Sequence, residues 1–255
     1  MNELNIYTGR NSQIGQYLPD NLQYVSYDIE DELTWGFLQD CKNLFLIIPK
    51  IPHVLEHCKN FIYAAKVSGV KKIVKIGSLG SWKVIHNQLD AYIRNCGINC
   101  VSLDISVLMN NIFTEQYVDG VLLNYRYDTP APYLDPKVLA IAITQSMDSD
   151  LVLNYNISAT GLYQYSIEDV KHVLESTGYP VRSIETVHNN RLHKNAGVTA
   201  DQRLMSDISD KYALGIYPKV STNFLMFDAV HRTLEDFVEQ DSQYFLNLQA
   251  GDKNL

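Results

Sequence analysis

Three residues near the middle of the chain have types and a spacing that can carry out proton transfer. His86 and Asp90 are four residues apart, so they share one face of a helix. A carboxylate beside an imidazole orients the ring and favours its charged form, which can act as a general acid. Lys83, one turn earlier, is a second candidate proton donor. The alternative interpretation is a surface or capping histidine with an incidental acid nearby.

Repeated strand–helix units are predicted to position these residues. The pattern consists of a helix that ends at Ser68-Gly69, an apolar run 73–76, a helix from about 84 to 95, and an apolar run 100–103. Short apolar strands that alternate with helices predict an α/β fold with a parallel sheet. Ligands bind such sheets beyond the carboxyl ends of the strands. Here those ends are 77–80 and 104–111, directly beside the candidate acids.

The motifs in this stretch resemble the NmrA-like branch of the atypical short-chain dehydrogenases. The chain reads AAKVSGVKKIVKIGSLG, then His86 four residues before an acid, then YIRNCGI and VLMNNI. The family typically reads GV-x-x-IV-x-x-SS, H-x-x-x-E, L-R-x-SG and F-M-x-N at these places. The resemblance implies a doubly wound, Rossmann-like parallel sheet that binds NADP or NAD. Where the family often has two serines, this chain has Gly77 and Ser78, and it lacks the Tyr-x-x-x-Lys pair of orthodox members.

The first strand leads into a degenerate version of the family's phosphate-binding turn. The chain reads TGRNSQIG where the family reads T-G-A-T-G-x-I-G. Ser12 replaces the middle glycine and adds a Cβ where backbone amides approach a pyrophosphate, although its hydroxyl or the Arg10 guanidinium can bind phosphate. A turn without a ligand is the alternative. The resemblance implies cofactor contacts from Gly9, Arg10, Ser12, Ile14, Gly15, Asp28, Ile48, Pro49, Gly77 and Ser78.

The sheet is predicted to be one βα unit short after this turn. Pro19 stops the first helix, and too little chain remains before Phe45 for two further strands. Residues 22–31 match the family's third strand, or, in a second alignment, Gln23–Tyr27 is the second strand. In the second alignment Asp28 is the acid that reads the ribose hydroxyl. Either loss removes contacts to the adenosine half, so dinucleotide binding is predicted to be weak or absent.

The remainder of the chain resembles the family's substrate lobe. A helix is expected to start at Pro136, and residues 151–157, 165–174, 180–185 and 232–240 are expected to form a strand, a helix capped by Ser166, a strand and a closing helix. We predict two domains, a Rossmann-like domain at 1–150 and a small α/β substrate-binding lobe at 151–255. Predicted substrate contacts are Trp82, Met109, Asn110 and Tyr133.

Composition narrows the possible partners. The 255-residue chain is 46% hydrophobic and carries a net charge of −8 with scattered basic residues, which argues against nucleic-acid binding. No apolar run approaches the ~20 residues of a membrane span. The four cysteines lack metal-ligand spacing and are predicted to be buried free thiols, with no metal site. We expect a cytoplasmic monomer or homodimer that binds a small molecule.

Three functions fit the sequence. The first is an NAD(P)H-dependent reductase of a small aromatic or conjugated metabolite, with His86 or Lys83 as proton donor and Asp90 as the orienting acid. The second is a cofactor-independent cyclase, isomerase or lyase on an eroded scaffold. The third is a non-catalytic nucleotide-sensing regulator. Fold by itself does not separate them.

Overall fold

The computed structural model describes residues 4–8, 14–20, 22–49, 51–79, 83–124, 129–149, 154–186, 220–221, 225–227 and 229–249. The predicted site residues Gly9, Arg10, Ser12 and Trp82 lie outside these ranges. The chain forms two compact units: the first contains 1–105, 136–159 and 223–229, and the second contains 106–135, 160–222 and 230–255. Each unit is therefore built from three separate segments of the chain. The division into a domain at 1–150 and a lobe at 151–255 stays a prediction.

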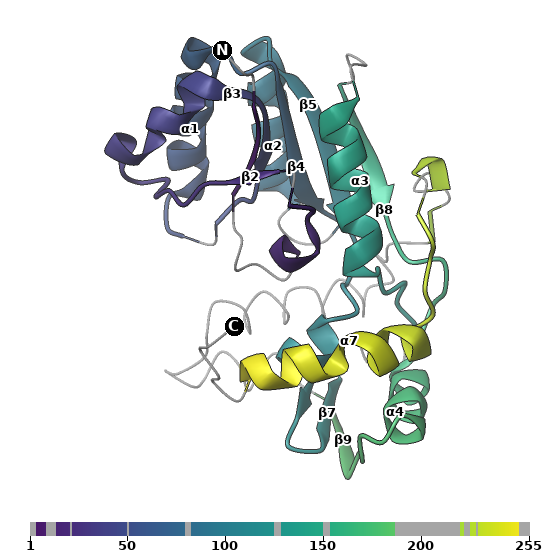
Figure 1. The fold of residues 1–255 in the computed structure, drawn as a ribbon. Helices are drawn as coiled ribbons and strands as arrows, with labels where there is room; N and C mark the ends of the chain where they lie inside the picture. Colours follow the sequence, from purple (N-terminus) through teal and green to yellow (C-terminus); the bar gives the residue numbers. More distant parts are fainter. Residues whose placement is uncertain are drawn as a thin grey trace. The chain divides into compact units, whose positions relative to one another are not determined.

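The first unit is built on a six-stranded sheet in which all neighbours run parallel. The strand order is β2-β1-β3-β4-β5-β8 (Figure 1). The strands are β1 (Leu4–Tyr7), β2 (Gln23–Tyr24), β3 (Cys41–Leu46), β4 (Lys72–Ser78), β5 (Asn99–Ile105) and β8 (Tyr155–Ala159). The central strands are buried on both faces, as their continuous apolar runs predict. The predicted α/β class and parallel sheet are confirmed.

Helices cover both faces of this sheet. Helices α1 (Val54–Ser68) and α2 (Lys83–Asn95) pack against each other on one face, and α3 (Pro136–Asp148) packs on the other (Figure 1). Side chains along β4 point alternately to the two faces of the sheet, because a strand has a two-residue period. The Lys72 ammonium bonds the Ser146 carbonyl of α3 at 3.0 Å, whereas Lys75, three residues later, points to the α2 face.

The N-terminal edge of the sheet is shortened as predicted. Between Leu18 and Leu44 the described residues contain one sheet strand before β3, the two-residue β2. Pro19 follows a single 3-10 turn, Gly15–Tyr17, in place of a full helix. Strand β2 pairs with β1 on the side away from β3, which is the place of the second strand in a doubly wound sheet. This position supports the second of the two alignments.

A 3-10 helix, η2 (Glu32–Asp40), connects β2 to β3. The Asp31 side chain caps it by accepting a hydrogen bond from the Leu33 amide at 3.0 Å. Its Trp35 packs edge-on against Phe61 of α1, with ring centroids 5.2 Å apart. The connection between β2 and β3 is therefore helical, and its Trp35 covers part of the core beside α1.

The second unit contains a three-stranded sheet of β6 (Tyr117–Val118), β7 (Val121–Asn124) and β9 (Ser183–Thr186), together with η3 (Ile112–Gln116), α4 (Ile167–Ser176) and α7 (Leu234–Gln249). Ser166 caps α4 as predicted, in a capping box with Asp169. Arg232, just before α7, binds both carboxylate oxygens of Asp135, at 2.6 and 2.8 Å, and Asp241 at 2.8 Å. No helix in the described part of the chain is long and apolar enough to cross a membrane.

Candidate functional site

Helix α2 places His86 and Asp90 on one face, as the spacing predicts, but the acid has a different main partner. The Asp90 carboxylate Oδ1 lies 2.7 Å from the Lys75 ammonium of β4, and the two side chains are 2% and 0% exposed. The same ammonium lies 3.5 Å from His86 Nδ1. A lysine in the centre of the sheet therefore stands between the two predicted catalytic residues.

His86 is consequently held in its neutral form. Burial, reinforced by the nearby Lys75 charge, lowers the pKa of His86 to about 4, and Asp90 opposes this shift. Asp90 does favour the charged imidazole, as expected, but burial and the Lys75 charge outweigh it, and the carboxylate itself is paired with Lys75. The role of His86 as proton donor stays a prediction. With a pKa of about 4, its imidazole is neutral at pH 7.

The ion pair belongs to a larger buried network on the α2 face of the sheet. Lys75 Nζ donates to Ser102 Oγ at 3.0 Å, and Ser102 Oγ donates to Asp104 Oδ1 at 2.9 Å. Asn156 of β8 donates its amide to Asp90 Oδ2 at 2.8 Å and approaches Asp104 Oδ2 at 3.5 Å. The network thus joins β4, β5, β8 and α2 across the carboxyl half of the sheet.

Register places Asp104 directly against Gly77. The two residues pair across β4 and β5, one position before each strand ends. A Cβ built on Gly77 would lie 1.9 Å from Asp104 Oδ1 and 2.7 Å from Ser102 Oγ. Only glycine leaves room for this carboxylate. The glycine that departs from the family's serine pattern is therefore explained by the acid beside it.

A separate cavity of about 390 Å³ opens at the carboxyl ends of β1, β2 and β3. Its lining includes the predicted cofactor residues Asp28 and Pro49, together with Thr8, Tyr24 and Tyr27. Asp28 Oδ1 accepts a hydrogen bond from the Glu30 amide at 2.9 Å, which orients the carboxylate in the loop that follows β2. A carboxylate has further lone pairs, so this bond is compatible with a ribose partner.

The other described cofactor candidates lie around the same sheet edge. Ile14 and Gly15 are buried at the start of the 3-10 turn, Ile48 follows β3, and Ser78 is the last residue of β4. The substrate candidates Met109, Asn110 and Tyr133 belong to the second unit and are buried there. The Tyr133 hydroxyl donates a buried hydrogen bond to Gln116 Oε1 at 2.9 Å, so it has a structural partner within the core of this unit. Their role in substrate binding stays a prediction.

Sequence reasoning missed Lys75, Ser102, Asp104 and Asn156. A signal for two of them was present, because Lys75 interrupts the run Ile73-Val74-Lys75-Ile76 and Asp104 follows Cys100-Val101-Ser102-Leu103. A charge inside a strand that is otherwise apolar has to find a buried partner. Ser102 and Asn156 carried no such signal, because uncharged polar residues are common in strands.

The cysteines take no part in this chemistry. Cys41, Cys58 and Cys100 are buried free thiols, as predicted, and Cys96 is half-buried. Burial raises the pKa of Cys41, Cys58 and Cys100 to about 12 in each case. Thiols with such pKa values stay protonated and unreactive at neutral pH.

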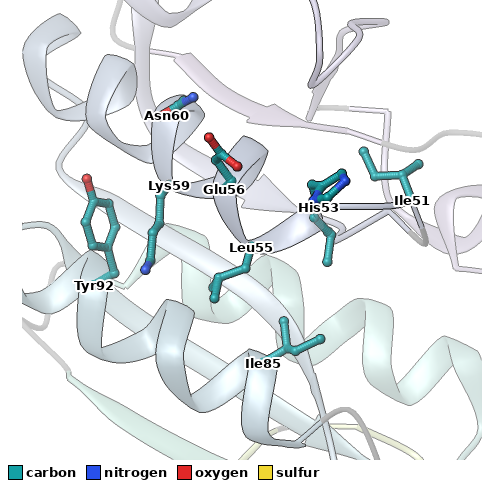
Figure 2. Close-up of a pocket in the computed structure, with 9 residues that line it drawn as sticks. Ile51, His53, Leu55, Glu56, Lys59, Asn60, Ile85 and Tyr92 are labelled. Carbon is teal, nitrogen blue, oxygen red and sulfur yellow. The ribbon is translucent and has the colours of Figure 1, made fainter.

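A second hollow, of about 700 Å³, lies between α1 and α2. Figure 2 shows Lys59 of α1 extending toward Tyr92 of α2, and its ammonium lies 5.6 Å from the centre of the ring. Leu55 and Ile85 line the apolar part of the same hollow (Figure 2). None of the described residues predicted for catalysis or binding lines it, so it is not part of the candidate site.

Solved structures show the same fold. A nucleoside-diphosphate-sugar epimerase from Staphylococcus aureus superposes with a TM-score of 0.77 at 15% identity, covering 94% of this chain and 100% of that chain. An NADPH-dependent quinone oxidoreductase from Escherichia coli, complexed with NADPH, gives 0.75 at 18% identity, covering 94% and 99%. A Citrobacter sp. triphenylmethane reductase complexed with NADP(H) gives 0.72 at 16% identity, covering 92% and 98%.

The chain has the Rossmann-like fold of these proteins. The similarity extends over nearly the whole length of each partner, so the predicted Rossmann-like architecture is confirmed. No family model matches the sequence, and no curated protein matches it.

Proposed function

We propose that this protein is an NAD(P)H-dependent reductase of a small aromatic or conjugated molecule. The observation that carries the proposal is the cavity at the carboxyl ends of β1, β2 and β3, lined by Asp28 and Pro49. In doubly wound sheets this edge is where dinucleotides bind. The likeness to two NADPH-bound reductases over more than nine-tenths of the chain supports the same assignment.

The described residues at this edge fit the adenosine half of a dinucleotide. The cavity of about 390 Å³ lies within the usual range for small-molecule sites, and Tyr24 and Tyr27 provide aromatic surface within it. Asp28 would accept a hydrogen bond from a ribose hydroxyl. The bound cofactor would supply a hydride to the substrate. Because a carboxylate repels the extra phosphate of NADP, we propose that Asp28 favours NADH over NADPH.

Calorimetry with NADH and NADPH tests the cofactor assignment. We expect binding in the high micromolar range, because the sheet is one unit short and each lost charged contact removes about 1.5–3 kcal/mol. Asp28→Asn should weaken NADH binding by about 10-fold or more on the same estimate. Asp40→Asn, an exposed carboxylate at the end of η2, is the matched control and should change nothing.

Turnover with two hydride acceptors tests the reaction class. A quinone and a cationic triphenylmethane dye should both be reduced, at rates that depend on the added cofactor. Failure of NADH and NADPH to bind at millimolar concentration would overturn the proposal. Substrate conversion by cofactor-stripped protein would instead favour the cofactor-independent enzyme. Binding without turnover of any acceptor would favour the nucleotide-sensing regulator.

A further inference from the structure

We propose that Asp104 is the proton donor of this reductase, held in place by Lys75, Ser102 and Asn156. The inference rests on the proposed reductase function and assigns its acid to the carboxyl end of β5, two strands from β3 in the same sheet. Nothing in the motifs singled out Asp104, because the candidates there were His86 and Lys83 on α2.

Position is the first argument. Asp104 lies next to the last residue of β5, and ligands of parallel sheets bind beyond these ends. Its carboxylate fills the volume that a side chain at Gly77 would need, since a Cβ there would lie 1.9 Å from Asp104 Oδ1. The resembling family often has a serine at that place in the strand. The carboxyl group of Asp104 therefore stands where a hydroxyl would otherwise be presented.

Charge balance is the second argument. The buried cluster contains one ammonium, Lys75, and two carboxyl groups, Asp90 and Asp104. Lys75 contacts Asp90 directly at 2.7 Å but reaches Asp104 only through Ser102. Asp90 is thus neutralised, and ionising Asp104 as well would leave a second negative charge buried without a direct cation. Burial accordingly raises the pKa of Asp104, with a smaller contribution from the Asp90 charge, against the lowering effect of Ser102, Lys75 and Asn156.

The hydrogen bonds agree with a proton on Asp104 Oδ2. Arg94 Nη2 donates to Asn156 Oδ1, which turns the Asn156 amide nitrogen toward the two acids. That nitrogen lies 2.8 Å from Asp90 Oδ2 but 3.5 Å from Asp104 Oδ2, so it binds the ionised acid more closely. Asp104 Oδ1 accepts the shorter bond, from Ser102 at 2.9 Å, and Oδ2 accepts the longer one, from Asn156 at 3.5 Å, so we assign the acidic hydrogen to Oδ2. Ser102 and Asn156 therefore act as positioning residues.

Exposure selects Asp104 from the network. Lys75 and Ser102 are 0% exposed and Asp90 is 1% exposed, whereas Asp104 retains 6% and His86 9%, so only the last two remain as candidates within the cluster. The other ionisable groups that face the cluster are His86, Cys100 and Arg94. The pKa values of His86 and Cys100, about 4 and about 12, make both neutral at pH 7, and Arg94 is bonded to Asn156. Asp104 is thus the acid of the cluster that has both a reason to hold a proton and a position one residue before the end of β5.

The chemical step balances with the proposed cofactor as reductant. A quinone carbonyl gains a hydride and one proton; the O–H bond of Asp104 breaks, the O–H bond of the reduced product forms, and the resulting carboxylate regains a proton from water. A triphenylmethane cation differs, because it accepts a hydride at carbon and needs no proton. The two acceptors therefore separate proton delivery from hydride delivery.

The activity test compares Asp104→Asn with the unmodified protein on both acceptors. Loss of a general acid usually costs about 10²–10⁴ in rate, so quinone reduction should fall by at least about 100-fold while the dye rate stays within about twofold. An unchanged quinone rate, or an equal loss on both acceptors, would overturn the proposal. A selective quinone loss in His86→Ala but not in Asp104→Asn would return the role to His86. Failure of the unmodified protein to reduce either acceptor is failure of the reductase proposal itself.

A second measurement needs no cofactor and no turnover. In protein labelled with ¹³C at aspartate carboxyl carbons, one buried aspartate should titrate clearly above the usual carboxyl range. Asp104→Asn, if it folds, should remove that resonance, whereas Asp40→Asn should keep it. If every aspartate titrates in the ordinary range, Asp104 holds no proton to donate and the proposal is wrong.

Discussion

Replacing Lys75 with methionine should destabilise the protein strongly. Methionine has a similar length and suits a buried site, so the change removes the charge with little loss of packing. Asp90 then remains 2% exposed without its ammonium, and Ser102 loses a donor at 3.0 Å. Removing one partner of a buried ion pair costs about 3–5 kcal/mol, because the remaining charge stays buried and unpaired.

The expected loss can be measured as a shift in thermal or urea unfolding. For a chain of this size, about 1 kcal/mol corresponds to roughly 2–4 °C in Tm, so Lys75→Met should lower Tm by roughly 6–20 °C. Lys71→Met is the control, because Lys71 is exposed immediately before β4, and its removal should change the free energy of unfolding by less than about 0.5 kcal/mol.

A double variant makes the reasoning refutable. In Lys75→Met with Asp90→Asn the buried charge is gone, and the amide oxygen introduced on α2 can still accept a hydrogen bond from Asn156. We expect the double variant to be more stable than Lys75→Met, with a coupling energy of at least about 1 kcal/mol. If the two changes are additive, or if Lys75→Met costs less than about 1 kcal/mol, the ion pair does not hold this face of the sheet as inferred.

Three further predictions follow from the same structure. His86 should titrate near pH 4 by NMR. Because the unfolded chain binds this proton near pH 6.5, the contribution of neutral His86 to stability is present above pH 6.5 and is lost as the pH falls toward 4, by roughly 3 kcal/mol in urea unfolding. A His86 pKa above 6 would contradict this prediction. Ser12→Gly should tighten NAD(P)H binding in calorimetry, because it restores the middle glycine of the phosphate turn, and unchanged affinity would exclude crowding by Ser12. Arg232→Lys should destabilise by roughly 2–3 kcal/mol in urea unfolding, since lysine cannot bind both oxygens of Asp135, and an equally stable variant would show that the bidentate geometry is unimportant.

Local sequence patterns were enough to predict the sheet and its shortened edge. Alternating apolar runs and glycine-terminated helices specify parallel strands, because each strand and helix has its own hydrophobic period. Pro19 predicted the missing first helix, since proline lacks the amide hydrogen that a continuing helix needs. The cap at Ser166 and the helix start at Pro136 were likewise predictable from a few neighbouring residues.

Only the tertiary structure decided which polar groups meet. Lys75, Asp90, Ser102, Asp104 and Asn156 come from three strands and a helix, and their contacts depend on strand register and helix placement. The sequence predicted that Asp90 pairs with His86, because they are four residues apart. In the structure the Asp90 carboxylate forms its ion pair with Lys75 of β4. Gly77 looked like a lost serine until the fold placed Asp104 against it. Short-range spacing determines shared faces, whereas burial and cross-strand neighbours determine charge states.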